Sequence, residues 1–151
     1  MNAPVALVPL VVLLPLIGAG AALALGRRAR AQRVLAVAAL VGMLAVSIVM
    51  LVAADTGGPL VMEVGGWAAP YGIVLVVDRL AALLLAISAI VLLAVLLFSV
   101  GQGLADGDAE TPVTIYYPTY LILAAGVAIA FIAGDLFNLY VGFEVLLVSS
   151  Y

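Results

Sequence analysis

Glu144 is the acidic residue of this sequence best placed for proton chemistry, because it lies within the apolar run "LFNLYVGFEVLLVSSY". If a helix enters a membrane near Leu136, Glu144 lies about 12 Å along it at 1.5 Å per residue. That depth is near the middle of a hydrocarbon core about 30 Å thick. A charge there costs at least about 2.5–3.5 kcal/mol, so such a residue normally meets a polar partner or water. A carboxyl held between desolvation, which favours its neutral form, and a nearby cation, which favours its charged form, can load and release a proton.

The residues that share a helical face with Glu144 are apolar or aromatic. Positions three, four or seven apart fall along one stripe of a helix. We expect this stripe to face inward, toward a polar partner or water. No other charge is predicted within the membrane, so a cationic partner has to come from sequence beyond these residues or from another subunit. The stripe consists of Phe137, Tyr140, Glu144, Leu147 and Tyr151.

Three further charged residues are candidate supporting polar residues. Asp135 lies nine positions before Glu144 and therefore on the opposite side of a continuous helix, so the two are not an acid–base pair. Asp135 is interpreted as an N-cap or interface residue. Asp78 and Arg79 begin another apolar stretch and are interpreted as an interfacial pair that fixes the depth of its helix, with coupling to a neighbouring helix as the alternative.

The composition is that of a membrane protein, because 68% of the 151 residues are hydrophobic and 9% are charged. Soluble domains carry about 25% charged residues. We predict an all-α, polytopic helical bundle with four full transmembrane helices and the start of a fifth. The predicted spans are residues 5–25, 34–54, 80–100, 114–133 and, incomplete, 136–151.

The charge distribution predicts the orientation of the bundle. Four of the five basic residues lie in "GRRARAQR", between the first two spans. Short loops rich in Lys and Arg stay cytoplasmic, which places the N-terminus and the connection between spans two and three outside. No Lys or Arg precedes Arg27, so we expect a retained first span rather than a cleaved signal peptide.

The connection between spans two and three is predicted to contain a short hairpin or extended segment. Two β-branched runs, 61–64 and 73–77, flank the turn-prone "GGWAAPYG". Trp67 and Tyr71 suit the aromatic belt at a membrane surface. Small residues at four-residue spacing predict close helix packing. They are Gly18, Ala22 and Gly26 in the first span, and Gly126, Ala130 and Gly134 near the fourth.

Several function classes are excluded by composition. The sequence has no cysteine and no histidine, so it cannot form disulfides, Cys/His metal sites or a histidine-based triad. No basic patch suits nucleic acid, and no cofactor is expected. The inner loop "GQGLADGDAE", with the acidic residues Asp106, Asp108 and Glu110, is interpreted as a solvated turn rather than a cation site.

Two motifs carry a resemblance to a known family. "GDLFNLYVGFEVLLVSSY" and "GGWAAPYGIVLVVDRLAALLL" together resemble the D subunit of multisubunit Mrp-type Na+/H+ antiporters. They are less closely similar to the proton-pumping membrane subunits of respiratory complex I and of membrane-bound hydrogenases. The resemblance implies that Glu144 matches the fifth-helix glutamate of the family, which is a proton-path residue working with lysines on later helices.

The resemblance also implies the setting of the protein. We expect these residues to be the N-terminal part of one antiporter-like transmembrane domain, in a protein about three times as long. Its partners would be other membrane subunits, the lipid bilayer, protons and a monovalent cation, Na+, at the cell membrane. It would be a secondary transporter subunit and not an enzyme. A redox-driven proton-pumping complex and a non-transporting membrane scaffold are the alternatives.

Overall fold

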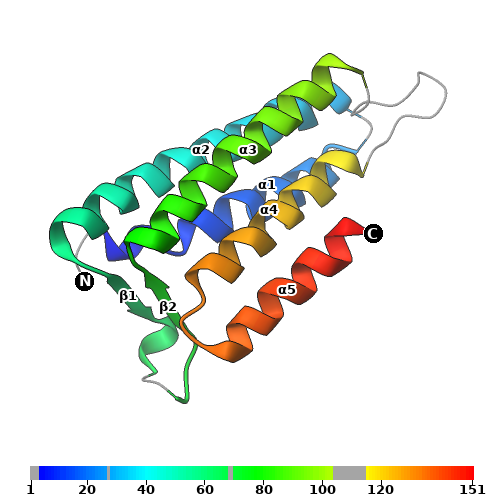
Figure 1. The fold of residues 1–151 in the computed structure, drawn as a ribbon. Coiled ribbons are helices and arrows are strands. Elements are labelled where there is room, and N and C mark those ends of the chain that lie inside the picture. Colours follow the sequence, from blue (N-terminus) through cyan, green and yellow to red (C-terminus); the bar gives the residue numbers. More distant parts are fainter. Residues whose placement is uncertain (1–3, 27, 68–69, 104–114) are drawn as a thin grey trace.

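The computed structural model describes residues 4–26, 28–67, 70–103 and 115–151. It is mostly helical, as predicted, and its helices lie side by side in a bundle with a small β-hairpin at one end (Figure 1). The inner-loop acids Asp106, Asp108 and Glu110 lie outside the described residues. The elements are η1 (Val5–Leu7), α1 (Leu10–Ala24), α2 (Ala29–Gly57), β1 (Leu60–Glu63), η2 (Val64–Gly66), β2 (Val74–Val77), α3 (Arg79–Gly101), α4 (Tyr116–Ile132) and α5 (Leu136–Ser150).

Among the described residues, three helical segments are long and apolar enough to cross a membrane. They are Val5–Ala24, Ala29–Gly57 and Arg79–Gly101. Helix α4 has 17 residues and α5 has 15, so both are apolar but shorter. At 1.5 Å per residue α4 is about 26 Å long, a little less than the hydrocarbon core.

Prolines stand where these helices tolerate them. Pro118 is the third residue of α4, in the first turn, where a backbone N–H has no partner within the helix. Pro9 precedes α1 with a helical φ of −69°. Pro15 lies inside α1 and is buried. Proline inside a membrane helix removes one backbone hydrogen bond but is tolerated where neighbouring helices cover the site.

The helix order in the bundle follows from small residues that allow close approach. Helix α1 packs between α2 and α4, α2 packs on α3, and α5 packs on α4. Gly18 of α1 lies at the first of these crossings: a β-carbon there would come within 3.1 Å of both Ala39 in α2 and Leu121 in α4. The predicted packing role of Gly18 is thereby confirmed.

Tyrosines of α4 tie that helix to α3. The Tyr116 hydroxyl bonds to the Ser99 hydroxyl at 3.0 Å, and the Tyr120 hydroxyl donates to the Leu92 carbonyl at 2.7 Å. The two tyrosines are four residues apart and therefore lie on the same side of α4, the side that faces α3. These bonds give the hydroxyls of two partly buried tyrosines their hydrogen-bond partners.

The predicted extended segment is an antiparallel hairpin. Leu60 pairs with Val77 and Glu63 with Val74, and Leu60 and Val77 turn their side chains into the core. The hairpin lies at the end of the bundle that also holds the N-terminus and the α4–α5 connection, while the arginine-rich connection lies at the opposite end (Figure 1). Trp67 and Tyr71 at its tip are exposed, with 67% and 87% of their surface free.

Candidate functional site

Helix α5 begins at an N-cap aspartate, as the sequence predicted. Asp135 has extended backbone angles, and its Oδ1 accepts a hydrogen bond from the Asn138 backbone N–H at 2.7 Å. The negative charge also complements the positive end of the helix dipole. The cap fixes the residue at which α5 begins, and with it the position of every residue along the helix.

The second oxygen of Asp135 makes a contact that the sequence does not predict. Oδ2 accepts a hydrogen bond from the Val74 backbone N–H of β2 at 3.2 Å. The neighbouring Gly134 N–H donates to the Val74 carbonyl at 2.8 Å, and Ala133 forms a β-bridge with Leu75. The segment 133–135 therefore runs along the edge of the hairpin as a short third chain.

Gly134 permits this close approach. A β-carbon at position 134 would come within 2.7 Å of both the Val74 carbonyl oxygen and the Val76 Cγ2. Real β-carbons essentially never approach so closely, so a larger residue would push the chain away from β2. The prediction that Gly134 contacts another helix is wrong, because Gly134 lies after the end of α4 and packs against β2.

Helix α5 turns a face of small residues toward α4. Gly142 sits against Ala130 and Ile129, and Gly126 of α4 sits against Leu146. A β-carbon at Gly142 would lie 2.9 Å from the Ala130 nitrogen. Small residues at such crossings bring helix backbones together, which is the usual basis of packing between membrane helices.

Within the described residues, the Glu144 stripe does not pack against α1–α4, and whether it faces inward in the complete protein stays a prediction. Glu144 is exposed, and the other four stripe residues are each more than half exposed. The physical reason is that the small residues on the other side of α5 form the tighter contact with α4. The stripe is left uncovered by α1–α4, and α5 lies at the edge of the bundle (Figure 1).

Tyr140 lies one turn before Glu144 on the same exposed face of α5, so its hydroxyl is a polar group near the carboxylate. Helix α4, which packs against α5, contains no Asp, Glu, Lys or Arg. Glu144 is therefore a carboxylate in the apolar part of a helix, with no charged neighbour on the helix that packs against it. Within the described residues no three His, Cys, Asp or Glu side chains are grouped in a way that could hold a metal ion.

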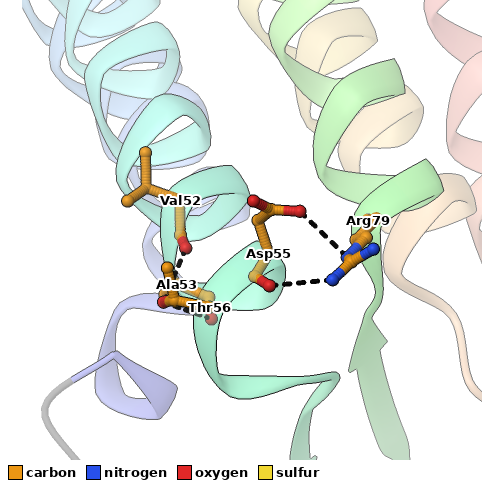
Figure 2. Close-up of polar contacts among 5 residues, drawn as sticks. All are labelled: Val52, Ala53, Asp55, Thr56 and Arg79. Carbon is orange, nitrogen blue, oxygen red and sulfur yellow. Dashed lines mark hydrogen bonds and ion pairs between the residues drawn. The ribbon is translucent and has the colours of Figure 1, made fainter.

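Asp78 and Arg79 do not pair with each other. Asp78 caps α3 through a 2.7 Å hydrogen bond from the Ala81 N–H to its Oδ1. Arg79 turns to α2, where its Nε lies 3.1 Å from Asp55 Oδ1 and its Nη2 donates to the Asp55 carbonyl at 2.8 Å (Figure 2). The alternative interpretation, coupling to a neighbouring helix, therefore describes Arg79.

Two buried amides were not singled out from the sequence. Gln32, 1% exposed, donates from Nε2 to the carbonyls of Ala22 and Gly26 at 2.8 and 2.6 Å, joining the end of α1 to α2. Asn138, 7% exposed, holds an Nδ2 with no hydrogen-bond partner in the described structure. The sequence did contain a signal for both residues: an amide side chain within or beside an apolar run needs a hydrogen-bond partner if it is buried.

Comparison with known proteins gives consistent matches. No protein-family model matches the sequence. The chain is 41% identical to the D subunit of the Na+/H+ antiporter of Alkalihalophilus pseudofirmus, over 96% of this chain and 29% of that protein. It is 40% identical to the D subunit of a probable K+/H+ antiporter of Rhizobium meliloti, over 72% of this chain and 20% of that protein.

Solved structures show the same fold. In the Mrp complex from Dietzia sp., a chain matches with a TM-score of 0.87 and 33% identity, covering all of this chain and 27% of that one. In the membrane-bound sulfane sulfur reductase, an archaeal respiratory complex, a chain matches with a TM-score of 0.80 and 27% identity. That match covers 95% of this chain and 29% of the other.

These apolar helices, with a hairpin at one end and a carboxylate within α5, define a multi-pass membrane protein of the antiporter-like class. The chain belongs to the D subunits of Mrp-type antiporters, the family that its two motifs indicated. It spans less than a third of the length of the curated relatives it matches.

Proposed function

We propose that this chain is part of a proton-translocating membrane subunit of a multisubunit monovalent cation/proton antiporter, with Na+ as the cation. It would act as a secondary transporter subunit rather than an enzyme, in the cell membrane and together with other membrane subunits. The names of the relatives support this proposal. Helix α4 would be the fourth span, and the hairpin end, with the N-terminus, would face outward.

One observation carries the proposal: the Glu144 carboxylate lies midway along α5 on an exposed face that is otherwise apolar and aromatic. Exposing a carboxylate to lipid at that depth is unfavourable. A polar partner or a water-filled path therefore has to cover this face in the working protein. A carboxyl in such a path can carry protons between the two sides of a membrane.

The proposal assigns different parts to the supporting residues. Glu144 carries the proton, and Asp135 holds the start of its helix. Asp78 caps α3, and Arg79 joins α3 to α2 through Asp55. Neither Asp78 nor Arg79 would carry protons.

The test is Glu144→Gln in the full-length subunit within the assembled complex, with proton exchange followed in everted vesicles after addition of Na+ or K+. Glutamine keeps the shape and hydrogen bonding of the side chain but cannot ionise. We expect exchange to fall by roughly a hundredfold, the lower range for loss of a positioned proton-transfer group. Glu63→Gln, which removes an exposed charge on the hairpin, is the matched control and should leave exchange unchanged.

A non-transporting scaffold predicts the opposite result, since Glu144→Gln would then leave exchange intact in a complex that assembles normally. A redox-driven proton pump is the second candidate function, favoured by the match to an archaeal respiratory complex. In that case proton movement in vesicles would require an electron donor and acceptor. Exchange driven by a cation gradient alone supports the antiporter.

A further inference from the structure

We propose that Asp135 is a positioning residue for Glu144: its carboxylate fastens the start of α5 to β2 of the hairpin, so that the hairpin sets the direction of the helix that carries Glu144. This inference rests on the proposed function of Glu144. It goes beyond helix capping, because it assigns the second carboxylate oxygen of Asp135 a separate task.

The two oxygens of Asp135 hold two different elements. Oδ1 receives the Asn138 N–H within α5 at 2.7 Å, and Oδ2 receives the Val74 N–H of β2 at 3.2 Å. The Gly134 N–H returns a bond to the Val74 carbonyl at 2.8 Å. The backbone N–H and C=O of Val74 are thus both bonded to the two residues that precede α5. Hydrogen bonds to an ionised acceptor are stronger than those between neutral groups.

The hairpin is itself attached to the bundle, so it can serve as a fixed support. Leu60 and Val77 are buried in the core. Strand β2 runs directly into the Asp78 cap of α3, and α3 is joined to α2 by the Arg79–Asp55 pair. Helix α5, by contrast, lies at the edge of the bundle and packs chiefly on α4. The bonds at Asp135 and Gly134 are therefore its second point of attachment.

The position of Glu144 depends on the direction of α5 at its start. Nine residues of helix separate Asp135 from Glu144, about 13.5 Å at 1.5 Å per residue. A tilt of about 10° at Asp135 would move Glu144 by roughly 2 Å over that length. Displacements of about 1 Å at a reacting group can lower a rate a hundredfold. A clamp at the end of the helix can therefore control proton transfer in its middle.

The test compares Asp135→Asn with Asp78→Asn in the full-length subunit of the assembled complex. Asparagine is as good an N-cap as aspartate, so both variants keep their cap and both lose one charge at a helix N-terminus. At position 135 the substitution has a second effect. It replaces the oxygen that accepts the Val74 N–H with an NH2 group, which cannot accept that bond. Within the described residues, the second oxygen of Asp78 makes no bond to the hairpin strands, so Asp78→Asn is the matched control.

Two measurements decide the outcome. Hydrogen exchange of the peptide containing Val74 should become faster in Asp135→Asn, while the Asn138 amide stays protected and Asp78→Asn shows neither change. Cation-driven proton exchange per assembled complex, measured across pH, should fall at least about tenfold or change its pH profile in Asp135→Asn alone. Loss of stability by itself would reduce the amount of complex but leave the pH profile of the remaining complex unchanged.

The inference is overturned if Asp135→Asn frees the Val74 amide while transport per complex keeps its rate and pH profile, or if the Val74 amide stays protected. Glu144→Gln is measured in parallel. An active Glu144→Gln variant refutes the proposed function, whereas an inactive Glu144→Gln with a fully active Asp135→Asn refutes the positioning role alone.

Discussion

Gly142 of α5 lies directly against Ala130 of α4, so closely that a β-carbon at position 142 would come within 2.9 Å of the Ala130 nitrogen and 3.1 Å of Ile129 Cγ2. This contact decides which face of α5 joins the bundle. The opposite face, with Glu144, is left for whatever covers it in the complete protein.

Gly142→Ala should therefore loosen α5 from α4. Overpacking a tight contact typically costs about 1–3 kcal/mol, and the rigid backbone of Ala130 cannot move aside as a flexible side chain would. We expect a lower midpoint of thermal unfolding for the detergent-purified complex. Gly20→Ala in α1 is the control, because nothing lies within 4 Å of a β-carbon there. An equal midpoint for the two variants would contradict the close α4–α5 contact.

Gly134→Ala tests the approach of the α4–α5 connection to the hairpin. The added methyl would meet the Val74 carbonyl and Val76 Cγ2, both at 2.7 Å, so the bond from the Gly134 N–H to Val74 should lengthen or break. We expect faster hydrogen exchange in residues 133–135 and a loss of stability of about 1–3 kcal/mol. Gly101→Ala, at the end of α3 and with open space around it, should do neither. Unchanged hydrogen exchange in Gly134→Ala would contradict the close contact between residues 133–135 and β2.

Gln32 is expected to secure the turn between α1 and α2. Gln32→Leu keeps the size of the side chain but leaves the carbonyls of Ala22 and Gly26 without the donor they now share. The Ala22 carbonyl keeps a 3.2 Å bond from the Leu25 N–H and Gly26 is exposed, so the loss is that of two ordinary hydrogen bonds. Each contributes about 0.5–1.5 kcal/mol, so the variant should unfold at a lower temperature. Gln102→Leu, at an exposed position after α3, is the matched control. The prediction fails if both substitutions lower the unfolding temperature equally.

Local features of the fold were predictable because local signals specify them. The apolar runs indicated the helices, the β-branched runs at 61–64 and 73–77 indicated the hairpin, and Asp135, just before the last apolar run, indicated an N-cap. Each of these depends on residues close together in sequence, where periodicity, turn preference and capping act.

The contacts that shape the candidate site were not predictable, because they join distant parts of the chain. Asp55 is 24 residues from Arg79, and Val74 is 61 residues from Asp135. Which face of α5 packs on α4 was not predictable for a related reason. Both faces of α5 are largely apolar, so hydrophobic periodicity does not identify the packed one, and Gly142 with its small neighbours decides it.

The Arg79–Asp55 contact joins α2 and α3 at the ends next to the hairpin, and its two bonds predict different effects for the two substitutions. Both side chains are mostly exposed, at 70% and 66%, and exposed ion pairs contribute about 1 kcal/mol or less. Asp55→Asn weakens the charge attraction but keeps the 2.8 Å bond from Arg79 to the Asp55 carbonyl. Arg79→Gln removes both the ion pair and the guanidinium group that donates this bond. Arg79→Gln should therefore lower the unfolding temperature more than Asp55→Asn.

Salt dependence and transport separate the two parts of this contact. The difference in unfolding temperature between wild type and Asp55→Asn should shrink as salt is raised from about 0.01 to 1 M, because screening weakens exposed pairs. The two variants should still transport protons, since neither residue touches Glu144. If Asp55→Asn proves the more destabilising, the carbonyl bond contributes little and the ion pair is the main link. Loss of transport in Arg79→Gln, with the complex intact, would instead place Arg79 in the proton path.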